Sequence, residues 1–246
     1  MLSWLKTHPF AVEAFFEHSL VLTFAAPVTE IQALLPAPLV ADTFAERWGF
    51  VAVALVQTRD LRPKGFPAWL GHDFYLIGYR VFVRYQSADG KRLRGLYILG
   101  SQTDKPGMTA LGNLFTHYRY QTVDIASQQT AGRLDIRSQQ AEFRVTLVPP
   151  TAKVMLPAQS PFATWQEARR FAGPLPFTFS VDSDASRMLI VEGVRQNWEP
   201  QPVAVEQYQV GFLNHLKLSN PILANAFALH DVPYHWKKGR TEAWAR

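Results

Sequence analysis

The sequence predicts a mainly β protein of the α+β class, with a curved antiparallel sheet or barrel and a few packed helices. Three observations support this fold class. Apolar, β-branched segments recur at short intervals, turn residues separate them, and helical patterns do not alternate with them regularly. A length of 246 residues suits a β barrel, and we expect a single domain over residues 1–246.

Two neighbouring segments predict a central hairpin. Phe74–Tyr85 and Leu93–Thr103 are rich in aromatic and β-branched residues, and the Asp89-Gly90 pair between them is a strong signal for a tight turn. The apolar segment Phe50–Leu61 precedes this hairpin and predicts another strand. Further strands are expected at Gly132–Ser138, Ala141–Val148, Phe177–Val181, Arg187–Arg195 and Val203–Phe212.

Four segments predict helices. Val28–Leu35 begins with a capping-box pattern in which Thr29 precedes Gln32 by three residues. Phe162–Ala172 follows Ser160, a candidate N-cap, and ends just before a glycine. The other two expected helices are Met108–His117 and Phe212–Phe227, with Pro221 interrupting the second.

Composition and motifs exclude several classes of protein. Hydrophobic residues make up 48% and charged residues 18%, so the chain can bury a sizeable core. The absence of cysteine excludes disulfides, thiolate nucleophiles, zinc–thiolate sites and iron–sulfur clusters. No glycine-rich nucleotide-binding fingerprint and no nucleophile elbow is present, and the seven histidines form no metal-binding pattern. We therefore expect no cofactor and no metal.

Charge and hydropathy indicate where the protein acts. The net charge of +5 is mild, and the basic residues are scattered in small groups, so we expect no nucleic-acid partner. No segment has the roughly 20 consecutive apolar residues of a spanning helix, and the first residues lack a secretory pattern. The sequence thus favours a soluble cytoplasmic protein without membrane contact.

Arg80 stands in an unusual setting. Strand alternation places it on one face of its segment with Phe82 and Arg84, and both faces of that segment are largely apolar. An arginine rarely lies inside a protein without a partner. Either it pairs with an internal carboxylate such as Asp60 or Asp104, or it binds an anionic ligand, since a guanidinium forks onto a carboxylate or phosphate.

Lys105 is a second candidate, because it follows the end of a strand and precedes a helix. A lysine held near apolar walls and other cations can attack a carbonyl as a free amine. A lysine in a polar turn is otherwise simply solvated. The residues alone leave both alternatives open.

Six short motifs occur along the chain, at Leu34–Leu39, Arg62–Pro67, Tyr79–Arg84, Arg94–Leu99, Leu223–Phe227 and Val232–Trp236. Together they resemble one known family, the YqjF-like family, or domain of unknown function 2071, of the acetoacetate-decarboxylase-like superfamily. The resemblance covers roughly residues 20–239 and depends on the order and spacing of the motifs. It implies a barrel- or cone-like sheet with an internal cavity.

The superfamily also implies a chemistry. Acetoacetate decarboxylase forms a Schiff base between a lysine and a ketone, and Lys105 is the residue of this chain that matches that position. Two features differ from the decarboxylase pattern. Pro106 stands where an adjacent lysine is expected, and no glutamate occurs between Glu46 and Glu142.

Three functional hypotheses follow. The first is a domain that binds a small organic acid or other anionic metabolite in an internal cavity, with Arg80, Phe82, Arg84 and Gln102 as ligand-binding residues. The second is a Schiff-base-forming lyase with Lys105 as its catalytic residue. The third is an interaction or scaffold module whose barrel centre is packed with side chains. The identity of the ligand and the oligomeric state stay open.

Overall fold

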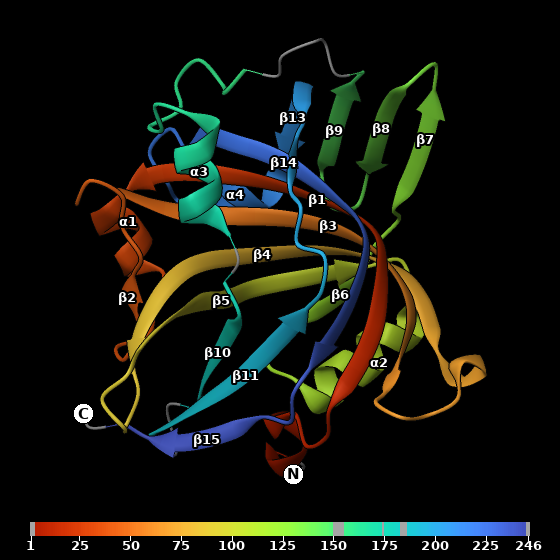
Figure 1. Ribbon diagram of the computed structural model, residues 1–246, viewed down its shortest axis with the longest axis vertical. Helices are drawn as coiled ribbons and strands as arrows, with labels where there is room; N and C mark the ends of the chain where they lie inside the picture. Colours follow the sequence, from red (N-terminus) through yellow and green to blue (C-terminus); the bar gives the residue numbers. More distant parts are fainter. Residues whose placement is uncertain (1–2, 150–154, 174, 183–185, 245–246) are drawn as a thin grey trace.

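Seven strands of the larger sheet close into a ring in the computed structural model, which describes residues 3–149, 155–173, 175–182 and 186–244 (Figure 1). The ring runs β14-β1-β3-β4-β5-β10-β11 and closes where β11 pairs with β14. Its strands are β1 (Val12–Pro27), β3 (Trp48–Pro63), β4 (His72–Gln86), β5 (Arg92–Thr103), β10 (Phe177–Asp182), β11 (Arg187–Arg195) and β14 (Ile222–Trp236).

The predicted central hairpin is confirmed. β4 and β5 pair antiparallel from Leu76↔Thr103 to Gln86↔Arg92 around the expected turn. The sheet is mixed rather than purely antiparallel, because β5 pairs in parallel with β10 and with β6 (Tyr120–Thr122). Parallel pairing needs a crossover, and helix α2 (Pro106–Phe115) supplies it between β5 and β6.

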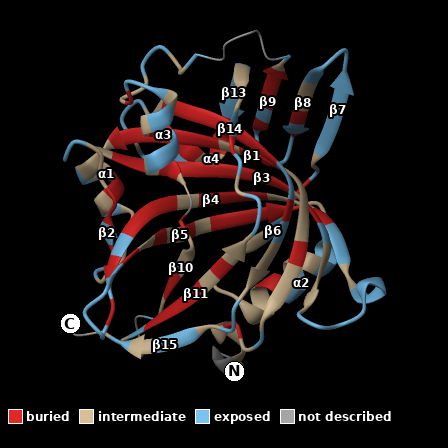
Figure 2. Cartoon of the chain, viewed as in Figure 1, coloured by how far each residue is buried: buried red, intermediate tan, exposed pale blue. Residues whose placement is uncertain are grey.

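A smaller sheet packs against the outside of the ring. Its order is β13-β9-β8-β7, from β7 (Ala126–Thr130), β8 (Arg133–Ser138), β9 (Phe143–Val148) and β13 (Ala204–Val210). Ile136 and Val145 of this sheet share one buried cluster with Leu22, Val53 and Ile77 of the ring. The ring strands beneath it are accordingly buried along most of their middle portions (Figure 2).

Helix α3 (Trp165–Ala172) covers one end of the ring (Figure 1). Phe171 of this helix joins Phe50, Phe82 and Phe162 in an aromatic cluster, with Phe50 and Phe82 ring centroids 5.9 Å apart. The expected cap at Ser160 is wrong, because Thr164 caps the helix and accepts a hydrogen bond from the Glu167 amide.

Helix α1 (Val28–Ala33) forms where the sequence predicts it, but without the expected capping box. No side chain caps its N-terminus. The Gln32 amide instead bridges two backbone groups beyond the helix, donating to Leu39 O at 3.0 Å and accepting from Ala41 N at 2.9 Å. The glutamine therefore fixes the chain that leaves the helix.

The predicted helix over Phe212–Phe227 is wrong for most of its length. α4 (Gly211–His215) ends early, and β14 begins at Ile222 because that segment pairs with the long strand β1. Within the described residues, no helix has both the length and the apolar character to cross a bilayer. The remaining elements are η1 (Ser3–Thr7), β2 (Val40–Ala41), η2 (Ala68–Leu70), β12 (Gln201–Pro202) and β15 (Arg240–Ala243).

Candidate functional site

The interior of the ring contains a cavity of about 110 Å³, which we call the chamber. Its lining comes from strands all around the ring, so the chamber lies at the axis of the fold. Most of the lining is apolar, from residues such as Val21, Ala54 and Leu229. The polar and charged lining residues are Ser19, Arg80, Ser101, Tyr118, Tyr120, Thr178, Arg195 and Tyr234.

Arg80 enters the chamber from the middle of β4. Gly78 precedes it by two residues on the same face, and a Cβ at Gly78 would lie 3.0 Å from both Nε and Nη2 of Arg80. The glycine therefore leaves the space that the guanidinium occupies. The Arg80 Nε is buried and has no hydrogen-bond partner among the described residues.

The alternative in which an internal carboxylate neutralises Arg80 is wrong. Asp104 accepts a hydrogen bond from the Tyr75 amide at 2.8 Å, and its other oxygen lies 3.2 Å from Lys105 Nζ. Asp60 does not line the chamber, and its amide donates to Asp73. Among the residues that the structure describes, no carboxylate pairs with the Arg80 guanidinium.

A second arginine adds to the positive charge of the chamber. The Arg195 guanidinium lies 4.5 Å from the ring centre of Trp198 and 5.4 Å from that of Tyr234, and its Nη2 donates to Leu175 O at 2.9 Å. No aspartate or glutamate occurs among the described residues of the chamber lining. Burial lowers the pKa of Arg80, and the nearby charge of Arg195 acts in the same direction.

Tyrosine hydroxyls supply further hydrogen-bonding groups. Burial raises the pKa of Tyr120 to about 12 and also raises the pKa of Tyr118, so both phenols stay protonated at neutral pH. The positive charge of Arg80, which lines the same chamber, acts in the opposite direction on the pKa of both tyrosines. A protonated phenol can donate to an anion, so the chamber combines donors and positive charge.

The other predicted ligand-binding residues lie outside the chamber. Phe82 shares the face of Arg80 but packs in the aromatic cluster that closes the end of the ring. Arg84 lies two residues beyond Phe82 on β4, where its Nε donates to the fully buried carboxylate of Asp42 at 2.5 Å. Gln102 lies on the opposite face of β5, because its neighbour Ser101 faces the chamber.

Lys105 occupies the N-cap position of helix α2, at the strand-to-helix junction that the sequence predicts, and makes no side-chain capping hydrogen bond. Its side chain is 57% exposed and its ammonium lies 3.2 Å from Asp104 Oδ2. It does not line the chamber, and no other lysine does so among the described residues. The structure therefore separates Lys105 from Arg80.

The sequence did not predict four of the lining residues, Arg195, Tyr118, Tyr120 and Tyr234. One signal would have revealed Arg195. Gly193 precedes it by two residues, just as Gly78 precedes Arg80, so a small residue on the same face accompanies each inward-facing arginine. A Cβ at Gly193 would lie 1.9 Å from the Tyr234 hydroxyl, so this glycine admits the tyrosine.

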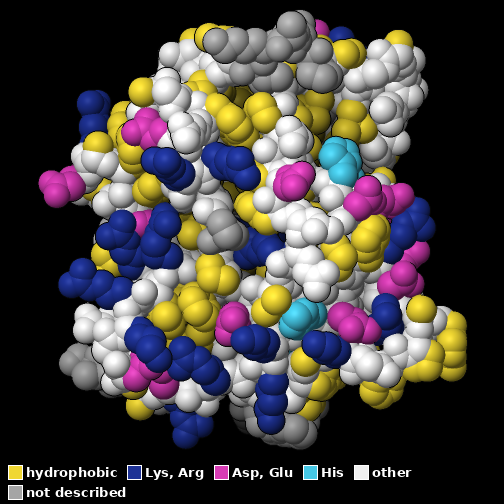
Figure 3. All heavy atoms as spheres, in the orientation of Figure 1, with side chains coloured by type: hydrophobic (Ala, Val, Ile, Leu, Met, Phe, Trp, Pro, Cys, Tyr) yellow, Lys and Arg dark blue, Asp and Glu magenta, His cyan; other side chains and the backbone are white. Residues whose placement is uncertain are grey.

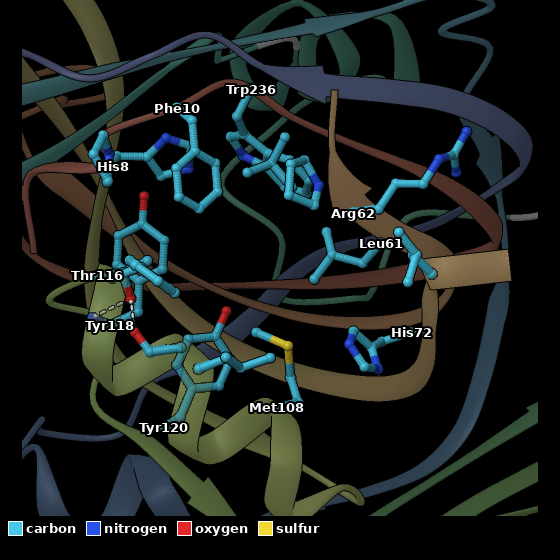
Figure 4. A pocket seen from close by; sticks show the side chains of 17 residues that line it. His8, Phe10, Leu61, Arg62, His72, Met108, Thr116, Tyr118, Tyr120 and Trp236 are labelled. Carbon is cyan, nitrogen blue, oxygen red and sulfur yellow. Dashed lines mark hydrogen bonds between the residues drawn. The ribbon is translucent and has the colours of Figure 1, made fainter. Parts of the chain in front are cut away.

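An outer groove of about 220 Å³ adjoins the chamber (Figure 4). It lies between helix α2, the chain that leads from η1 into β1, and the ends of β3 and β4. Tyr118, Tyr120 and Trp236 line both the groove and the chamber. These three aromatic residues form the shared wall of the two cavities.

The closed ring of strands around a small internal chamber is an acetoacetate-decarboxylase-like fold, as comparison with solved structures shows. Acetoacetate decarboxylase from Legionella pneumophila is similar at a TM-score of 0.60 and 11% identity, over 94% of this chain and 87% of that one. The enduracididine biosynthesis enzyme MppR, in complex with pyruvate, is similar at a TM-score of 0.58 and 12% identity, over 95% and 90% of the two chains.

The sequence pattern that defines the family of domain of unknown function 2071, described as an uncharacterised conserved protein, matches residues 13–230. The chain therefore belongs to this family, as the motifs of the sequence indicate. A search of curated protein sequences found no significant match.

Proposed function

We propose that this protein binds a small organic acid in the chamber, with the carboxylate of the acid on the guanidinium of Arg80. One observation carries the proposal. A guanidinium lies inside the ring, beside a second arginine, in a chamber whose described lining contains no carboxylate. An unpaired buried charge is costly, and an anionic ligand removes that cost.

The geometry of the donors fits a carboxylate. A guanidinium presents its N–H groups as a planar fork that matches the two oxygens of a carboxylate. Tyr118 and Tyr120 provide protonated hydroxyls in the same chamber. The chamber volume of about 110 Å³ suits an acid of a few carbon atoms. The ligand class we propose is therefore a short carboxylic or 2-oxo acid.

Two structures of the same fold support this ligand class. One holds pyruvate, and the other holds the condensation product of pyruvate and imidazole 4-carboxaldehyde. At 11–12% identity they establish a shared fold, and the proposal depends on the residues of this chain. It assigns binding, and it gives Lys105 no role in that binding.

Isothermal titration calorimetry with pyruvate tests the proposal. Wild-type protein should bind pyruvate, and Arg80→Met should lose that binding while retaining its fold by circular dichroism. Arg92→Met is the matched control, because Arg92 is an exposed arginine of β5 outside the chamber lining and its loss changes the net charge equally. Equal binding by wild type and Arg80→Met would refute the proposal.

Neutral analogues separate the charge from the shape of the ligand. Pyruvamide has nearly the outline of pyruvate but carries no negative charge. It should bind wild-type protein at least tenfold more weakly than pyruvate, because hydrogen bonds between charged partners are roughly twice as strong as neutral ones. If pyruvamide binds as well as pyruvate, the guanidinium is not what selects the ligand.

A further inference from the structure

The outer groove offers a surface of different chemistry from the chamber. Its lining is largely apolar, with Phe10, Leu61, Met108, Leu111 and Phe115 among the contributing residues. Figure 4 shows Phe10, Leu61 and Met108 arranged around the same hollow as Tyr118 and Tyr120. Such a surface binds hydrocarbon.

Arg62, the arginine that lines the groove, already has partners within the protein. Arg62 pairs with Glu13 at 2.9 Å and donates to Phe66 O at 2.9 Å and to Asp60 O at 2.8 Å. It therefore has little to offer a second anion. The groove therefore offers mainly apolar contact, whereas the chamber holds the guanidinium of Arg80.

Apolar side chains remain exposed around the groove. Phe10 is 37% exposed, Leu70 is 39% exposed and Leu111 is 40% exposed, although all three line the hollow. The neighbouring η2 loop, at the right of Figure 3, also presents Trp69, which is 81% exposed. Clustered exposed apolar residues mark a binding surface more often than scattered ones.

The shared wall links the groove to the chamber. The ring of Tyr120 fits against Gly112 of helix α2 so closely that a Cβ there would lie 2.3 Å from it. The ring centroid of Trp236 lies 4.5 Å from that of Tyr234 and 5.8 Å from that of Phe16, and both of these residues line the chamber. A ligand that occupies both cavities must therefore pass between these aromatic side chains.

We infer that the natural ligand is an amphipathic monocarboxylic acid, whose carboxylate lies in the chamber on Arg80 and whose hydrocarbon chain passes the shared wall into the outer groove. This inference rests on the proposed function and deepens it. It adds a second subsite and a direction, with the head group inside and the tail toward solvent. A chain of several methylene groups fits the groove volume of about 220 Å³.

Affinity should then rise with chain length. Burying one methylene group is worth about a fourfold change in the dissociation constant. In the series pyruvate, 2-oxobutanoate, 2-oxohexanoate and 2-oxooctanoate, the dissociation constant should fall at each step until the groove is filled. Calorimetry on the intact protein measures each value directly.

A carboxylate placed in the groove should abolish this gain. Leu111→Asp puts a charge among the apolar residues of the groove at an exposed helix position, so the fold should tolerate it. Met108→Asp is a second variant, in the first turn of α2, where a carboxylate suits the helix dipole. Ala110→Asp is the matched control, because Ala110 is exposed on the same helix and does not line the groove.

The inference expects three results together. Pyruvate binds wild type and all three variants alike, 2-oxooctanoate binds wild type far more tightly than pyruvate, and Leu111→Asp and Met108→Asp remove that advantage by tenfold or more while Ala110→Asp keeps it. If pyruvate and 2-oxooctanoate bind equally, or if the groove variants leave both unchanged, the second subsite is refuted and the proposed function stands. If no acid of the series binds, the proposed function itself fails.

Discussion

Replacing Arg80 by methionine should stabilise the protein in the absence of ligand. The substitution removes the guanidinium and keeps an unbranched apolar stem of similar length. Because no carboxylate pairs with Arg80 among the described residues, the change leaves no buried anion without a partner. It also removes a buried Nε donor that makes no hydrogen bond.

The size of this change in the free energy of unfolding follows from the loss of the unpaired Nε donor of Arg80. A buried polar group without a partner costs about 1–3 kcal/mol. The methionine side chain keeps an apolar stem in a chamber whose lining is mostly apolar, so little apolar burial is lost. We therefore expect the free energy of unfolding of Arg80→Met to exceed that of wild type by about 1–3 kcal/mol.

Urea denaturation of both proteins at pH 7, followed by tryptophan fluorescence and circular dichroism, measures this difference. A guanidinium in a buried ion pair would give the opposite sign, a loss of about 3–5 kcal/mol, since its removal strands the partner. Destabilisation of that size in Arg80→Met would show that the arginine is a structural ion-pair partner. It would contradict a binding role for the unpaired guanidinium.

Three further predictions follow from other parts of the structure. Asp42→Asn should destabilise the protein by about 2–4 kcal/mol in urea melts, because the fully buried carboxylate of Asp42 forms ion pairs with both Arg84 and Arg94. A free energy of unfolding equal to that of wild type would show that these ion pairs contribute nothing to stability. Burial and the neighbouring His230 lower the pKa of His18 to about 4, below its ordinary value of 6.5. The unfolded chain therefore binds a proton here more readily than the folded one, so this group removes up to about 3 kcal/mol of stability as the pH falls from 6.5 to 4. The loss should be smaller in His18→Asn, and an unchanged pH profile in that variant would contradict the assignment. Borohydride treatment in the presence of pyruvate or 2-oxohexanoate should leave Lys105 unmodified, because its exposed ammonium pairs with Asp104 outside the chamber. Peptide mapping measures the modification, and an adduct at Lys105 would support the Schiff-base mechanism.

Local patterns in the sequence predicted much of the ring. The hairpin of β4 and β5 was predictable because the Asp89-Gly90 turn and the flanking apolar segments agree. β14 was not predictable in this way, since its segment becomes a strand through tertiary pairing, chiefly with β1, more than 190 residues away. The closure of the sheet into a ring was predictable only from the family resemblance, because a strand pattern does not specify which sheet edges pair with each other.

The candidate site followed the sequence only in part. Alternation correctly turned Arg80 inward, but it also turned Phe82 and Arg84 to the same face, and their position along β4 decides what they contact. Distance from the end of the ring is a tertiary property that periodicity does not contain. The sequence pattern also did not predict Tyr118 and Tyr120 as site residues. They reach the chamber from the segment that follows α2, and this placement is likewise a tertiary property.

A crystal structure with 6-bromohexanoate tests the central claim most directly. The bromine marks the tail by its anomalous signal, and the carboxylate is recognised by its density. We predict a carboxylate within hydrogen-bonding distance of the Arg80 guanidinium and a bromine peak in the outer groove near Met108. A fully occupied ligand with its carboxylate away from Arg80, or a chamber that holds only water at saturating ligand, would contradict the account.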